Sequence, residues 1–209
     1  AAAHFDVPDL LAVQVEGQTT GYASARLQWD LSPAIAFRGV AGLAARDSGY
    51  GYDGGWTFDG FDPIGYSSTD RYLRERRTGS VDLRWLSGPS GRLFGDTPGW
   101  VFAVYGRSRR AARERRYTYA DADFTSRFTI DRLAVYAELD RALTERVGLS
   151  FGLRAERHDA RYRDSESVRV APRDDMHGGR LVLPWDAAPG SMVYASISRG
   201  YKAGGFNIS

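Results

Sequence analysis

The last sixteen residues, YASISRGYKAGGFNIS from Tyr194 to Ser209, carry the clearest fold signal in this chain. Together with the preceding valine, the first of them alternate between apolar side chains and small or polar ones: Val193, Ala195 and Ile197 against Tyr194, Ser196 and Ser198. This period of two residues is typical of a β-strand with one apolar and one polar face. A glycine-rich, aromatic and cationic segment follows, so the sequence predicts a strand that runs into a loop.

The composition is polar enough to resemble that of a soluble protein. Charged residues make up 26% of the 209 residues, and the mean hydropathy is −0.41. No apolar run approaches the roughly 18 residues of a membrane helix. A strand of an outer-membrane barrel needs only about 9–11 residues, and every second side chain faces a polar interior. The composition therefore remains compatible with a transmembrane β-barrel.

Neither a cofactor site nor a catalytic site is expected. The chain has no cysteine, and its three histidines, His4, His158 and His177, are far apart without partners at metal-ligand spacing. No metal site is predicted. The net charge is only +2, which is too small to indicate a nucleic-acid partner.

The rest of the chain repeats the period-two pattern in four hairpins. The expected strands cover residues 20–31, 34–46, 71–87, 99–112, 129–142, 147–160, 176–186 and 192–202. In the first hairpin, pairing Leu31 with Ile35 places Trp29 opposite Phe37. In the second, Trp85 is expected opposite Trp100. Val135 is expected opposite Ala155 in the third, and Leu181 opposite Ile197 in the fourth. These registers pair apolar with apolar side chains.

Short turns alternate with longer polar connections, at 47–70, about 108–128 and 158–176. This alternation is typical of outer-membrane barrels, whose periplasmic turns are short and whose extracellular loops are long. Four tryptophans fall beside the short turns on the apolar face and are predicted to form an aromatic girdle: Trp29, Trp85, Trp100 and Trp185. The alternative is that they are core residues of a soluble protein.

The alternation also predicts which side chains face lipid and which face the lumen. The lipid-facing set is Leu83, Phe102, Leu139, Phe151, Leu183 and Ala195. The lumen-facing set is Asp82, Glu138, Arg154 and Ser196.

The segment from Tyr194 to Asn207 closely resembles a motif in the barrel of TonB-dependent outer-membrane receptors. The stretch RLAVYAELDRALTERVGLSFGLRAER, residues 132–157, is similar to a strand–turn–strand unit of the same family. The resemblance implies an all-β, antiparallel, transmembrane barrel. About eight strands out of 22 would be present, so that residues 1–209 form a partial barrel domain. The plug, the TonB-contacting segment and the remainder of the barrel would be absent.

The family resemblance further implies a function in transport rather than catalysis. It suggests ligand-gated, active uptake of a scarce solute, most often a ferric siderophore, across the outer membrane of a Gram-negative bacterium. The implied partners are outer-membrane lipid and lipopolysaccharide, the ligand, and the TonB complex acting through the missing N-terminal regions. A passive porin-like barrel and a soluble glycan-binding β-sandwich are the alternatives.

Arginines are concentrated at the loop ends of two neighbouring strands. Arg76, Arg109 and Arg113 are the candidate anion-binding residues among them. The register that pairs Trp85 with Trp100 places Arg76 opposite Arg109. Such a rim is either solvated and paired with local acids, or it binds lipopolysaccharide phosphates on its outward face, or it attracts an anionic ligand on its inward face.

Two further groups are candidate ligand contacts. Trp56, Phe58 and Tyr66 belong to an aromatic segment expected to form an extracellular loop, which suits a flat, partly apolar ligand. The inner-wall candidates lie on the polar side of the last strand and beyond it: Tyr194, Ser196, Ser198, Lys202 and Asn207.

Overall fold

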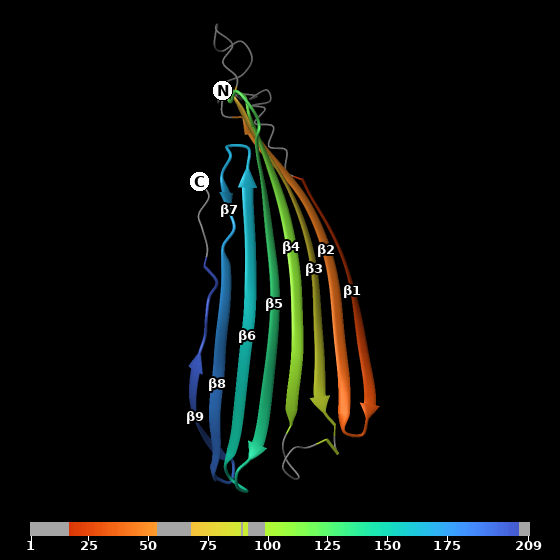
Figure 1. Ribbon diagram of the computed structural model, residues 1–209, viewed down its shortest axis with the longest axis vertical. Coiled ribbons are helices and arrows are strands. Elements are labelled where there is room, and N and C mark those ends of the chain that lie inside the picture. Colours follow the sequence, from red (N-terminus) through yellow and green to blue (C-terminus); the bar gives the residue numbers. More distant parts are fainter. Residues whose placement is uncertain (1–16, 54–67, 89, 92–98, 205–209) are drawn as a thin grey trace, which may run out of the picture.

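The computed structural model describes residues 17–53, 68–88, 90–91 and 99–204. Within them the chain forms a single antiparallel sheet (Figure 1). The strands are β1 (Gly17–Ser32), β2 (Ile35–Asp53), β3 (Thr69–Ser87), β4 (Trp100–Tyr117), β5 (Phe124–Ala142), β6 (Gly148–Asp164), β7 (Arg169–Val170), β8 (Arg173–Ala188) and β9 (Ser191–Arg199). Each long strand pairs with the next in sequence, and β6 pairs with β8, while β7 is a two-residue strand beside β6. The described residues contain no helix that is long and apolar enough to cross a membrane.

The expected all-β antiparallel fold is confirmed, with β7 as the one strand that the sequence did not predict. The turns at the lower end of Figure 1 connect β1 with β2, β5 with β6, and β8 with β9. The turn between β8 and β9 passes through Pro189 and Gly190, and Gly190 has a φ of +79°. Proline before glycine suits this turn, because the second central residue of a type II turn needs a positive φ.

The strands extend well beyond the segments with an apolar face. The connections expected at 47–70, 108–128 and 158–176 are shorter than predicted, because β2 continues to Asp53, β4 to Tyr117 and β6 to Asp164. Only residues 118–123 separate β4 from β5. In these upper parts of β2, β4 and β6, pairing with neighbouring strands satisfies the backbone N–H and C=O groups, as it does in the parts with an apolar face. Both of their faces are polar, so period-two hydropathy could not reveal them.

The predicted registers hold in three hairpins and fail in one. Trp29 lies opposite Phe37, Val135 opposite Ala155 and Leu181 opposite Ile197, as expected. A bulge near the first turn places Ile35 opposite Ser32 instead of Leu31.

In the second hairpin, Trp85 pairs with Phe102 and not with Trp100. The prediction that Arg76 lies opposite Arg109 is therefore wrong: Arg76 faces Ala111, and Arg109 faces Thr78. A shift of two residues keeps every side chain on its face, and apolar residues line both registers, so hydropathy alone could not distinguish them.

The two faces of the sheet differ in polarity and in burial. One face carries the apolar side chains, and many remain exposed, among them Leu133 at 57% and Leu153 at 53%. The buried side chains within the strands lie on the other, polar face: Asp70, Ala103, Ala134, Glu156, His158, Ala160 and Tyr162. Side chains crowd one another on the concave side of a curved sheet and diverge on the convex side. We therefore call the polar, concave side the inner face and the apolar, convex side the outer face.

Candidate functional site

The most concentrated charge on the inner face is a group of arginines on β3, β4 and β5, which we call the inner arginine cluster. Its members are Arg74, Arg76, Arg107, Arg109, Arg113 and Arg132. The cross-strand pairing places Arg74 opposite Arg113 and Arg107 opposite Arg132. Like charges in directly opposed positions repel one another, so this arrangement favours an anion between them.

Two members of the inner arginine cluster have buried donors without acceptors. The Nε atoms of Arg109 and Arg113 are shielded from solvent and have no hydrogen-bond partner among the described residues. Within the same part of the chain, Arg132 is the only member in an ion pair, with its Nε 3.9 Å from Oε1 of Glu156. A buried donor without an acceptor costs free energy, so these guanidinium groups are suited to bind a carboxylate, phosphate or similar anion by donating hydrogen bonds to it.

Aromatic rings line the inner face directly above the arginines. The rings of Tyr50 and Tyr72 stack with a centroid separation of 4.7 Å. The guanidinium groups of Arg74 and Arg113 lie over these rings, 5.3 Å from the centroid of Tyr50 and 5.0 Å from that of Tyr72. Cations over aromatic faces are held in fixed orientations. The surface therefore combines flat rings with oriented positive charge.

Sequence analysis did not identify this tyrosine stack, because residue 50 was assigned to a loop. Continuing the alternation through Tyr50 and Tyr52 on β2, and through Asp70, Tyr72 and Arg74 on β3, would have placed all five on the inner face.

The upper end of the stack is anchored by Asp70, whose side chain is only 4% exposed. Arg115 donates to it through Nη2 at 2.7 Å, and the hydroxyl groups of Tyr52 and Tyr72 donate at 3.1 Å each. The hydrogen bond from Arg115 is the main cause that holds the pKa of Asp70 below its usual value. Because the folded-state pKa is lowered, the stabilisation is present above the ordinary carboxyl pKa and is lost as the pH falls through the lowered value.

We expect Asp70→Asn to loosen the upper ends of β2, β3 and β4 at neutral pH. Losing a charged hydrogen bond whose cation is partly exposed should cost about 1 kcal/mol, or about fivefold in local opening. Amide hydrogen exchange of the full-length protein would report this in β3 and β4 near residues 69–73 and 113–117. The difference from the wild type should disappear in acid, where the carboxyl group is protonated. A difference that persists in acid would contradict the ionic origin.

A second polar network occupies the inner face lower down, around the buried Glu156 on β6. Arg154 lies 2.8 Å from Glu156 through Nη2 and donates from Nε to the hydroxyl group of Tyr201 at 2.7 Å. Tyr201 in turn donates to Glu156 at 3.1 Å. On the other side, Arg132 donates to Nδ1 of His158 at 3.0 Å. This network ties the segment after β9 to β5 and β6, and sequence patterning did not indicate it.

The C-terminal candidates are divided by the structure. Ser198 lies opposite Arg180 and lines an inner-face groove of about 770 Å³ with Arg154 and Tyr201. Tyr194 and Ser196 share the inner face but lie nearer the turn, where both are exposed. Because β9 ends at Arg199 and not at the predicted residue 202, Lys202 is beyond the strand, and it is exposed. Asn207, Trp56, Phe58 and Tyr66 are outside the described residues.

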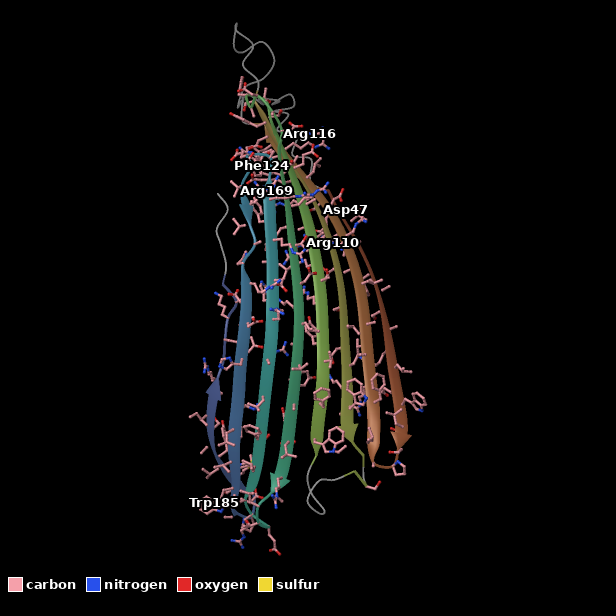
Figure 2. All side chains as sticks on the ribbon, in the orientation of Figure 1. Asp47, Arg110, Arg116, Phe124, Arg169 and Trp185 are labelled. Atoms are coloured by element: carbon pink, nitrogen blue, oxygen red, sulfur yellow. The ribbon has the colours of Figure 1, made fainter. Side chains whose placement is uncertain are left out.

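All four predicted girdle tryptophans occupy outer-face positions near the lower turns, and Figure 2 labels Trp185 there. Trp85 lies between Phe37 and Phe102, with centroid separations of 5.3 and 5.8 Å. Trp100 donates from Nε1 to the carbonyl oxygen of Gly91 at 2.9 Å. An apolar ring with one satisfied polar atom suits a boundary between lipid and water.

The fold resembles that of solved structures of two siderophore receptors and a copper transporter. The ferric yersiniabactin uptake receptor FyuA from Yersinia pestis matches with a TM-score of 0.71 and 18% identity, over 92% of this chain and 29% of that one. The siderophore receptor PiuA from Acinetobacter baumannii matches with a TM-score of 0.61 and 13% identity, over 86% and 32%. The copper transporter OprC matches with a TM-score of 0.58 and 16% identity, over 86% and 31%.

The chain thus spans about a third of the length of these proteins. A sequence comparison with curated proteins finds no match. The family model described as TonB dependent receptor-like, beta-barrel, matches residues 6–209. The sheet of long antiparallel strands, with a polar inner face and an apolar outer face, agrees with this match. The chain belongs to the β-barrel family of TonB-dependent receptors.

Proposed function

We propose that the chain is part of a receptor in the outer membrane of a Gram-negative bacterium that takes up a scarce anionic solute, such as a ferric siderophore, by active transport. Residues 1–209 would form one part of the barrel wall. A plug and a TonB-contacting segment elsewhere in the full protein would gate the pore and receive energy from the TonB complex. This function consists of binding and transport and needs no catalytic step.

The observation that carries the anionic preference is the inner arginine cluster with the unpaired Nε atoms of Arg109 and Arg113. Its position on the concave face supports the proposal that it lines the route of the solute through the barrel. A positively charged wall raises the local concentration of an anion, and guanidinium groups bind carboxylate, catecholate or phosphate oxygens in pairs. The stacked Tyr50 and Tyr72 add flat surfaces for a partly aromatic chelate.

The main alternative is a passive channel with the same wall. Energy dependence distinguishes the two, because active transport stops when a proton uncoupler removes the energy that TonB delivers. Uptake that continues at the same rate with the uncoupler would overturn the active mechanism. The other alternative, a soluble β-sandwich, is not supported, since the family is one of membrane barrels and apolar side chains of the outer face are exposed.

The direct test replaces Arg76, Arg109 and Arg113 together by glutamine in the full-length receptor. Binding of anionic, radiolabelled iron chelates should weaken about tenfold at low salt, which corresponds to about 1.4 kcal/mol. The loss should shrink at high salt, because the screening length shortens.

The matched control replaces Arg110, Arg127 and Arg163, which lie on the outer face, by glutamine. This control removes the same charge without touching the inner wall. If both triple variants bind the chelates equally well, the inner arginines do not contact the ligand.

A further inference from the structure

Beyond β9 the chain continues along β8 instead of extending the regular pairing (Figure 1). By the alternation of β9, Tyr201 would face outward together with Arg199. Its hydroxyl group instead donates to Glu156 on the inner face of β6, on the far side of β8. The alternation therefore ends at Gly200. We call residues 200–204, which lie against the inner face, the inward strap.

A glycine on the inner face of β8 makes room for the inward strap. A Cβ atom at Gly178 would lie 2.6 Å from the carbonyl oxygen of Arg199 and 3.1 Å from the ring of Tyr201. A glycine within a strand is typical of a place where another piece of backbone approaches closely. Any other residue at position 178 would push the strap away from the sheet, so β8 itself encodes its path.

The inward strap is held at two points. At the lower one, the hydroxyl group of Tyr201 donates to Glu156 at 3.1 Å and accepts from Nε of Arg154 at 2.7 Å. At the upper one, the backbone N–H of Gly204 donates to Oδ2 of Asp174 on β8 at 3.1 Å. Within the described residues, this N–H is the only hydrogen-bond partner of the Asp174 carboxylate. The upper end of the strap therefore depends on one hydrogen bond.

His158 on β6 lies beside this upper hydrogen bond and is only 4% exposed. It is directly opposite Asp174 on one side and Arg132 on the other. Its Nδ1 accepts a hydrogen bond from Nε of Arg132 at 3.0 Å. Arginine nitrogen atoms only donate, so the Nδ1 that faces Arg132 carries no proton. The imidazole is therefore neutral in the arrangement that holds the strap.

Protonation would change the preferred partner of His158. Histidine is the side chain whose charge ordinarily changes between about pH 8 and pH 5. An imidazolium can no longer accept from Arg132 and is repelled by it, whereas the carboxylate of Asp174 attracts it. Side chains in directly opposed positions are close enough for such a pair. The charged and titratable groups around His158 are Arg132 on β5, Arg107 beyond it on β4, Glu156 on β6, Asp174 on β8 and Tyr201 in the strap.

We propose that the inward strap is released by acid: a protonated His158 pairs with Asp174 and takes its carboxylate from Gly204, so that residues 202–204 leave β8. Tyr201 stays bound to Glu156 and acts as the hinge. Because the closed strap requires a neutral imidazole, the open form binds one more proton, and a falling pH favours opening. Opening uncovers the inner face of β8 above the groove of about 770 Å³ whose wall includes Tyr201. The release does not depend on which solute the protein binds.

The experiment measures the mobility of the strap in the full-length protein in detergent. A spin label is attached through Ala203→Cys, since residues 1–209 contain no cysteine, and any cysteine elsewhere is replaced by serine. Electron paramagnetic resonance spectra are compared at about pH 7.5 and about pH 5.5, a range above the usual titration of carboxyl groups. The mobile fraction should rise about fivefold in acid, which corresponds to about 1 kcal/mol. A label at Ser196, an exposed position of β9, should give the same spectrum at both pH values and so report an intact sheet.

Two variants keep the hydrogen bonds of the closed strap and remove the charge change. In His158→Asn, the amide oxygen can accept from Arg132 but does not titrate, so the label at 203 should stay immobile at both pH values. In Asp174→Asn, the amide oxygen still accepts from Gly204 but has no charge to attract an imidazolium, so the response to acid should also disappear. Asp174→Ala removes the upper hydrogen bond, and the label should be mobile at both pH values.

Equal mobility of the label at 203 at both pH values in the otherwise wild-type protein would overturn the proposal. A response to acid that persists in His158→Asn would also overturn it, because another group would then be the one that titrates. So would a response that persists in Asp174→Asn, because the imidazolium would then act through a different partner.

Discussion

Leu139→Arg should reduce the amount of receptor that assembles in folded form, whereas Glu138→Arg, one residue earlier, should leave assembly largely intact. Leu139 is an outer-face residue of β5 that lies opposite Trp100 on β4 and Phe151 on β6. Its pairing with Trp100 places it near the lower edge of the apolar band. An arginine on the lipid face there should cost about 1 kcal/mol, which is less than the roughly 2–4 kcal/mol expected at the bilayer midplane.

Glu138 points to the inner face, where it lies 3.7 Å from Arg180. An arginine at position 138 loses this exposed ion pair, which is worth at most about 1 kcal/mol, and remains in contact with water. The measurement is the quantity of heat-modifiable, folded receptor in outer-membrane fractions. Leu139→Met serves as the control for altered packing and should assemble normally. Comparable amounts of folded Leu139→Arg and Glu138→Arg protein would show that the outer face does not meet lipid.

The second large effect is expected at Glu156, whose side chain is 7% exposed and balances two arginines. Glu156→Ala leaves Arg154 and Arg132 without their carboxylate and frees the hydroxyl group of Tyr201. Breaking a fully buried ion pair costs about 3–5 kcal/mol. Since both arginines are more than a third exposed, about 2 kcal/mol is the expected loss in the free energy of unfolding. Denaturant unfolding of the full-length receptor in detergent measures it.

A double variant separates the charge from the packing at this site. Combining Glu156→Leu with Arg154→Met removes the closest pair together, so that much of the lost stability should return. Glu156→Gln should fall between the wild type and Glu156→Ala, because the amide still accepts from Tyr201. If Glu156→Ala unfolds at the same denaturant concentration as the wild type, the network does not stabilise the sheet.

Patterning predicted the fold where one face of a strand is apolar and the other is not. In the β5–β6 hairpin, Val135 and Ala155 are correctly paired because every one-residue slip would turn the apolar side chains of one strand to the polar inner face. The alternation of apolar and polar residues is absent from the upper parts of β2, β4 and β6, where both faces are polar. There, backbone hydrogen bonds alone continue the sheet, and residues 113–117 of β4 were not predicted as strand.

The site was predicted in kind but not in detail. Arg76, Arg109 and Arg113 were predicted to lie close together. Alternation of side chains along β3 and the full length of β4 would have placed all three on the inner face. The partners of Glu156 were not predictable, because Tyr201 is 45 residues away in sequence and reaches β6 across β8. Contacts of this range depend on curvature and side-chain rotamers, and a one-dimensional alternation contains neither.

The pleat of β4 turns alternate residues of one short run, RSRRAARERR at residues 107–116, to opposite faces of the sheet. A substitution within this run changes one face at a time. An insertion or deletion of a single residue between Trp100 and Arg107 would instead exchange the two faces, turning Arg109 to the outer face and Arg110 to the inner face. We expect related proteins to tolerate varied residues here and changes of two in length, but to exclude odd changes. The count of residues above the tryptophan is then itself a selected property, independent of their identity.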